Sequence, residues 1–222
     1  MIVNKKLNEL ILMLFPIMAF VVTAILYAKI PDMIPSGYNL EGLATGLSEK
    51  SFIVFLIPIV SLFIYFYFMI IPKIDIERVS YKKSSITYNR LRYLMAIGIT
   101  IINVVYLINL FNIDNPIVFV ALKATFAVIL FLIGDRLPKI KRNFFIGVVN
   151  AWTVSDNIVW MRTHRFTGFL ACTISLILFI LAFINTIWST ALYCSLIFVL
   201  VVVPHIYALE HYHKVAQKIM ED

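Results

Sequence analysis

The chain has 222 residues, of which 62% are hydrophobic and 14% charged, and its mean hydropathy is +0.94. A soluble domain of this length could not bury so much apolar surface, so the composition indicates a protein embedded in a lipid bilayer. The formal net charge of +7 comes from residues in short segments between apolar runs. These charges form no separate basic domain, so we expect no direct nucleic-acid partner.

Five uncharged or nearly uncharged runs follow one another along the chain. They are Leu10–Ala28, Ser51–Pro72, Tyr93–Ile113, Asn115–Gly134 and Phe166–Leu209. Because a span needs about 20 residues, the last run is long enough for two helices, with a tight turn expected at Asn185-Thr186. Only helices satisfy every backbone amide within hydrocarbon here, since the runs lack the alternation of barrel strands. We therefore predict an all-α polytopic membrane protein with six transmembrane helices.

Lysine and arginine are distributed unequally between the two sides of such a bundle. The segments on the side of the N-terminus hold sixteen of them, and those on the other side hold two, Lys29 and Lys50. Cytoplasmic segments carry the excess of positive charge. This predicts cytoplasmic N- and C-termini, cytoplasmic loops at 73–92 and 135–165, and an extracytoplasmic loop at 29–50. We expect two modules of three spans each, residues 1–112 and residues 113–222.

The two longest loops differ in composition. The outer loop, 29–50, contains two prolines and three glycines, which favour turns over a helix and indicate a compact connector on the membrane surface. The loop at 135–165, termed the motif loop, interleaves basic residues with aromatic ones, as is typical of the lipid headgroup region. Thr153 and Asp156 have the spacing of a capping box, so we expect a helix to begin there and continue into the fifth span. These residues alone fit either an amphipathic re-entry into the membrane or a recognition surface.

The motif loop also resembles the signature of the SdpI family, bacterial immunity proteins against a secreted toxic peptide. The matching elements are Pro138-Lys139, Asn143-Phe144-Phe145-Ile146-Gly147, Trp152-Thr153, Trp160 and Thr163-His164-Arg165. Family members often have Arg-Thr-Pro before the Trp-Thr pair, where this chain has Val149-Asn150-Ala151. The outer loop is similar to a short N-terminal module of unknown function that is often fused to that domain. Its matching elements are Pro31-Asp32, Ile34-Pro35, Asn39, Gly42 and Lys50.

The resemblance implies a membrane immunity or signalling protein that protects against a membrane-active toxin peptide. As in the best-known member, it also implies recruitment of a cytosolic repressor, and a basic, aromatic loop is suited to an acidic partner surface. The cytoplasmic binding residues implied are Pro138, Lys139, Asn143, Phe145, Gly147, Trp152, Thr153, Trp160, His164 and Arg165. The outer binding residues implied are Pro31, Asp32, Pro35, Asn39 and Gly42.

Lys123 is the formally charged residue inside a predicted span. It is either an intramembrane functional group or a lysine that reaches the outer surface from about two turns away. Near the C-terminus, His211 and His213 are two residues apart and do not share a helix face, so we expect no metal site.

The sequence contains no nucleophile elbow, phosphate loop, paired zinc motif or kinase signature. We therefore expect no enzymatic activity, no catalytic residue and no cofactor. The alternative function is a small-solute transporter or channel, with Lys123 and the prolines within spans lining its path. The partners expected are the lipid bilayer, a secreted toxin peptide and a cytosolic repressor protein, and the location is the cell membrane, crossed several times.

Overall fold

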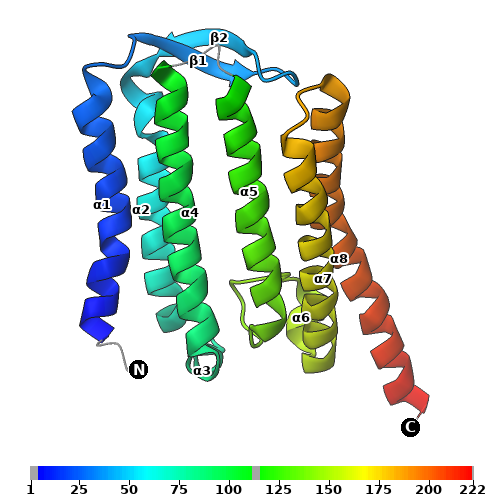
Figure 1. The fold of residues 1–222 in the computed structure, drawn as a ribbon. Coiled ribbons are helices and arrows are strands. Elements are labelled where there is room, and N and C mark those ends of the chain that lie inside the picture. The colour runs from blue at the N-terminus through cyan, green and yellow to red at the C-terminus, as the bar shows by residue number, and fades with distance from the viewer. Residues whose placement is uncertain (1–4, 112–115, 222) are drawn as a thin grey trace.

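The computed structural model describes residues 5–111 and 116–221, and consists of long helices with one small hairpin (Figure 1). Within these residues, six helices are long and apolar enough to cross a membrane, which confirms the predicted fold class. They are α1 Lys5–Tyr27, α2 Lys50–Ile74, α4 Ser85–Phe111, α5 Pro116–Arg136, α7 Asn157–Ala182 and α8 Ile187–Glu221. The shorter elements are β1 Met33–Tyr38, β2 Ala44–Glu49, α3 Arg78–Lys83, the 3-10 helix η1 Leu137–Lys139 and α6 Ala151–Ser155.

The long helices stand side by side in one bundle (Figure 1). Helices α1, α2 and α4 contact one another and are termed the first group, α5 and α8 both contact α7 and are termed with it the second group, and α4 packs closely on α5 between them. The β1–β2 hairpin lies across one end of the bundle, termed the hairpin end. The opposite end, termed the basic end, holds α3, α6 and the beginning of α1 and end of α8 (Figure 1). The predicted module boundary, between residues 112 and 113, lies outside the described residues.

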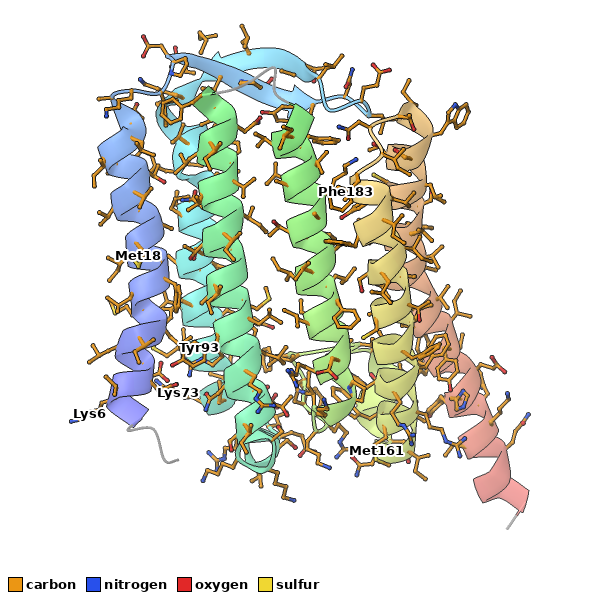
Figure 2. All side chains as sticks on the ribbon, viewed as in Figure 1. Lys6, Met18, Lys73, Tyr93, Met161 and Phe183 are labelled. Carbon is orange, nitrogen blue, oxygen red and sulfur yellow. The ribbon has the colours of Figure 1, made fainter. Side chains whose placement is uncertain are left out.

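Apolar side chains cover the outside of the bundle along its whole length (Figure 2). Ile25, Phe63 and Phe198 are each more than 60% exposed. In water such a surface would be an aggregation liability, whereas hydrocarbon solvates it. The interior between the helices is separately packed, with Val54 and Leu107 in one buried cluster.

The third span begins earlier than predicted, at Ser85 rather than Tyr93, so that Arg92 lies within a helix. The two terminal nitrogens of Arg92 donate to the two carboxylate oxygens of Glu9 on α1, both at 2.6 Å. A bidentate pair of this kind satisfies the guanidinium well enough for Arg92 to be only 7% exposed. The first residue of the apolar run therefore does not mark the beginning of the helix, because the Arg92 charge is paired with Glu9 on another span.

The turn predicted at Asn185-Thr186 is confirmed, since α7 ends at Ala182 and α8 begins at Ile187. The amide of Ser189 donates to the Thr186 hydroxyl at 3.1 Å, and the amide of Thr186 donates to the Ser189 hydroxyl at 3.2 Å. This reciprocal arrangement caps the first turn of α8 and stops the two helices from merging into one.

The outer loop folds into a hairpin, where the sequence predicted only turns. Its strands pair antiparallel in a register that runs from Met33 opposite Glu49 to Tyr38 opposite Ala44. The Asn39 side-chain oxygen accepts from the amides of Glu41 and Leu43 at 3.0 and 2.9 Å, which closes the tip. Gly42 has a φ of +81°, a backbone conformation that a glycine adopts without a steric penalty.

Candidate functional site

The motif loop is folded at the basic end around five residues, termed the motif core: the buried Asn143, Thr153, Trp160 and His164, and the exposed Gly147 that adjoins the histidine ring. The Asn143 side chain is 1% exposed and uses both ends of its amide. Its oxygen accepts from the amides of Phe145 and Ile146 at 2.9 and 2.7 Å, and its nitrogen donates to the carbonyls of Lys141 and Ile146. These bonds need both a donor and an acceptor on one short side chain. Aspartate at position 143 would lack the donor, so it could not replace asparagine.

His164 joins the loop to α7. Its Nε2 accepts the Val148 amide at 3.2 Å, and its Nδ1 lies 2.9 Å from the Trp160 carbonyl, so a neutral ring with the proton on Nδ1 satisfies both contacts. The ring stacks on Trp160 with centroids 3.9 Å apart, and the Trp160 indole donates to the Ile140 carbonyl at 3.0 Å. Gly147 leaves room for the ring: its φ is +107°, and a Cβ there would lie 2.2 Å from Nε2.

The capping box lies three residues earlier than predicted, which corrects our assignment of Thr153 and Asp156. The Asn150 side chain accepts from the Thr153 amide at 2.9 Å, and the Thr153 hydroxyl accepts from the Asn150 amide at 3.1 Å. This pair caps the short helix α6, whereas Asp156 caps α7 by accepting from Ile158 and Val159. Asparagine stands here where family members often have threonine, and both are favourable N-cap residues.

Residues 75–81, which connect α2 to α3 and include most of α3, form hydrogen bonds with the motif loop. The sequence alone did not predict this role. Asp75 is 3% exposed, and its Oδ2 accepts from the Tyr81 hydroxyl at 2.6 Å and from the Phe144 amide at 3.0 Å. Burial, together with the Asp75 carboxylate, raises the pKa of Tyr81, so its hydroxyl keeps the proton that it donates. The same hydroxyl lies 3.3 Å from the Asn143 side-chain oxygen.

Two further contacts cross from the first half of the chain to the motif loop. Arg142 donates to Glu77 at 2.6 Å, and the Tyr67 hydroxyl donates to the Phe145 carbonyl at 2.7 Å. A signal for this role was present in the sequence, because Asp75 and Glu77 are the two acidic residues in an otherwise basic loop.

The remaining predicted motif residues lie nearer the surface. Lys139 has a 49% exposed side chain and pairs with Asp135 at 3.0 Å. Arg165 is exposed, Phe145 is at the margin of exposure, and Trp152 is half-buried on α6. Pro138 packs closely against Gly168 of α7, where a Cβ would lie 2.8 Å from its ring. Nitrogen-bearing side chains gather at this end of the bundle, where Figure 2 labels Lys73 and Met161. The motif loop therefore combines a buried core with a cationic surface.

The outer-loop residues predicted to bind lie at the hairpin end and are not brought near the motif loop (Figure 1). Asp32 is exposed and pairs with Lys50 at 3.0 Å, and Lys50 also donates to the carbonyl of Tyr27, the last residue of α1, and to that of Ile30. Pro31 is exposed and Pro35 is buried. These contacts fasten the hairpin to the first residue of α2.

The hairpin also contacts the second group of helices through its tip. A Cβ at Gly42 would lie 2.5 Å from the ring of Phe119 on α5. The hairpin thus spans both groups, from the end of α1 to the beginning of α5.

Lys123 is 7% exposed, and its ammonium contacts the α7–α8 turn. The Nζ donates to the Asn185 side-chain oxygen at 3.2 Å and to the Ile184 carbonyl at 3.4 Å, and lies 4.8 Å from the centre of the Phe119 ring. The Tyr193 hydroxyl donates to the Lys123 carbonyl at 2.8 Å. The contacts of the ammonium group support a structural role for Lys123, in which its charge holds the α7–α8 turn. This is a third interpretation, besides an intramembrane functional group and a lysine that reaches the outer surface.

Comparison with known proteins agrees with the motif. Residues 139–208 match the SdpI/YfhL protein family, and residues 14–62 match a domain of unknown function, DUF1648. The chain is 24% identical to Immunity protein SdpI of Bacillus subtilis (strain 168) over 201 residues, 89% of this chain and 91% of that protein. The chain therefore carries an SdpI/YfhL-like segment at residues 139–208 and is similar to an immunity protein over most of its length. No solved structure matches it significantly.

The SdpI/YfhL match, residues 139–208, contains the whole motif core. The DUF1648 match ends at residue 62, so Asp75, Glu77 and Tyr81 lie outside both matches. With its six apolar helices, the chain is a multi-pass protein of the cell membrane.

Proposed function

We propose that the chain is a non-enzymatic membrane immunity and signalling protein, which protects its cell against a membrane-active toxin peptide and recruits a cytosolic repressor through the motif loop. The similarity to an immunity protein extends over 89% of the chain and so includes both ends of the bundle. In this proposal the basic end faces the cytoplasm, which the concentration of lysine and arginine at that end supports.

The observation that carries the proposal is the division of the motif loop into a buried core and exposed cations. The core side chains bond to the backbone of the loop itself, so they give it one shape before any partner arrives. Arg162 and Arg165 are exposed on the first turns of α7 beside that core. A preformed cationic surface steers and holds an acidic partner without the cost of ordering a flexible loop.

The hairpin end is the proposed meeting point with the toxin peptide. Of the outer-loop residues, the Asp32 side chain is 94% exposed and Asn39 is also exposed, so both are accessible from outside the membrane. In this proposal Lys50 and Gly42 do not meet the peptide directly. They hold the hairpin against the helix ends, Lys50 through the carbonyls of Tyr27 and Ile30, and Gly42 through its close approach to Phe119.

Protection is tested by complementation. The chain is expressed in B. subtilis strain 168 cells that lack their own SdpI, and these cells are grown together with the parent strain. Wild-type chain is expected to restore survival. A chain that reaches the membrane in normal amount and gives no rescue would contradict the immunity function.

Recruitment is tested with the double variant Arg162→Gln/Arg165→Gln. Cytosolic protein that co-purifies with the membranes is expected to fall at least about tenfold, since a charge-assisted contact is worth about one decade in affinity. The matched control is Lys82→Gln/Lys214→Gln, which removes the same charge from exposed positions outside the motif loop. An equal loss of co-purifying protein in both variants would show that the effect comes from net charge alone. It would contradict recruitment through the motif loop.

A further inference from the structure

We propose that a cleft at the basic end is a binding site for a phosphate group, free or carried on a lipid headgroup. The cleft has a volume of about 410 Å³, within the range of small-ligand sites. It lies between α3, the segment after η1 and the first residues of α7, so both halves of the bundle form its walls. This inference does not depend on the proposed immunity function.

Three cations line the cleft: Lys83 on α3, and Lys141 and Arg142 in the motif loop. Glu77 is the one carboxylate among the described residues of the lining, and it pairs with Arg142 at 2.6 Å. The site therefore carries an excess of two positive charges. Lys83 and Lys141 are both exposed, and neither takes part in an ion pair among the described residues, so an incoming anion reaches both ammonium groups directly.

The polar lining suits an anion with several acceptor oxygens. Ser80 contributes a hydroxyl and Asn157 a side-chain amide, which are neutral donors beside the ammonium groups. Arginine and lysine together are the usual partners of phosphate, because the guanidinium presents a fork of donors and the ammonium a point charge. A single carboxylate has fewer oxygens and less charge to offer this set of donors.

The rest of the lining is apolar. Pro138, Ile140, Trp160 and Met161 lie on the α5 and α7 side of the cleft. Trp160 is also part of the motif core and is 2% exposed, so its ring is held in place, whereas Met161 is 53% exposed. A phosphate on an apolar stem would fill both parts of the cleft, whereas a free phosphate would occupy the cationic part alone.

The test uses the purified full-length chain in an uncharged detergent at constant ionic strength. Binding is measured by calorimetry for inorganic phosphate, for dioctanoyl phosphatidylglycerol and for a hexaglutamate peptide. The variant Lys83→Gln/Lys141→Gln is expected to weaken phosphate-group binding by at least about tenfold, as the loss of one charge-assisted hydrogen bond would. The control Lys82→Gln/Lys139→Gln removes the same charge from α3 and from the 3-10 helix η1, at positions outside the cleft.

The outcomes separate the ligand sources. Binding of both inorganic phosphate and the lipid, lost only in the cleft variant, supports a site that needs the phosphate group alone. Binding of the lipid only, with the same loss, supports a headgroup site. Equal loss in cleft and control variants, no binding of either phosphate ligand, or binding of hexaglutamate alone would overturn the proposal.

Discussion

A single methyl group at position 147 is expected to displace His164 from the motif core. An ideal Cβ on Gly147 would lie 2.2 Å from Nε2 and 2.9 Å from Cδ2 of the histidine ring. The ring cannot move aside freely, because it stacks on Trp160 and accepts the Val148 amide at 3.2 Å. Gly147→Ala must therefore shift the backbone or break that hydrogen bond.

The magnitude follows from two contributions. A non-glycine residue at the φ of +107° found here stores about 1–3 kcal/mol of backbone strain. Leaving the buried Val148 amide without its acceptor costs a further 1–3 kcal/mol, roughly. Together they predict a loss of about 4 kcal/mol in the free energy of unfolding, a large part of the stability of about 5–15 kcal/mol typical of a folded protein.

Gly46 is the matched control, since its φ is +66° and a Cβ there would also meet a side chain. That neighbour is the hydroxyl of Ser36, 2.6 Å away on an exposed residue, and it can rotate aside by exchanging its exposed 3.3 Å hydrogen bond to the Thr45 carbonyl for one to water. Gly46→Ala is therefore expected to cost only the left-handed backbone penalty of about 1–2 kcal/mol.

The assay is unfolding of the purified chain in mixed detergent micelles by increasing dodecyl sulfate, followed by far-ultraviolet circular dichroism. Tryptophan fluorescence supplies a local readout, because Trp160 loses its stacking partner when His164 moves. If Gly147→Ala costs no more than Gly46→Ala and leaves the fluorescence unchanged, the argument that Gly147 makes room for the histidine is refuted.

Three further substitutions are checked in the same unfolding assay. Arg92→Gln removes both hydrogen bonds to Glu9 and is expected to cost about 2 kcal/mol, whereas Lys214→Gln, in an exposed pair, should leave the free energy of unfolding unchanged. Asp75→Ala removes the acceptor of the buried Tyr81 hydroxyl and of the part-buried amides of Glu77 and Phe144, and should cost about 3 kcal/mol, whereas Asp75→Asn, which keeps one acceptor oxygen, should cost clearly less. Lys123→Met should cost about 1 kcal/mol and leave survival in the complementation assay unchanged. Lost survival at normal stability would instead support an intramembrane functional role for that lysine.

The spans could be predicted from sequence because hydrocarbon imposes one simple requirement, about 20 apolar residues with every backbone amide satisfied. The same rule misplaced the start of α4, since a window of hydropathy does not register that Arg92 is neutralised by Glu9 from another helix. The hairpin was missed for a related reason. Strand β2 reads Ala-Thr-Gly-Leu-Ser-Glu and has little of the β-branched or aromatic content that marks a strand.

The motif residues were found by resemblance, but their division into buried and exposed sets needed the structure. Trp160 and Arg165 carry equal weight in a motif, whereas one is 2% exposed and the other lies at the surface. The misplaced capping box shows the limit of local spacing. Asn150, Thr153 and Asp156 are all capable caps, and only the break between α6 and α7 decides which residue caps which helix.

The contacts of the motif loop with Asp75, which accepts the Phe144 amide, and with the Tyr81 hydroxyl restrict how this chain can be recombined with its relatives. A breakpoint that transplants residues 139–208 alone would leave the Phe144 amide and the Asn143 oxygen facing a foreign α2–α3 connection. The segment that carries the family signature is therefore not a portable unit. A working chimaera has to inherit residues 75–81 with it, so the effective unit of exchange is discontinuous in the sequence.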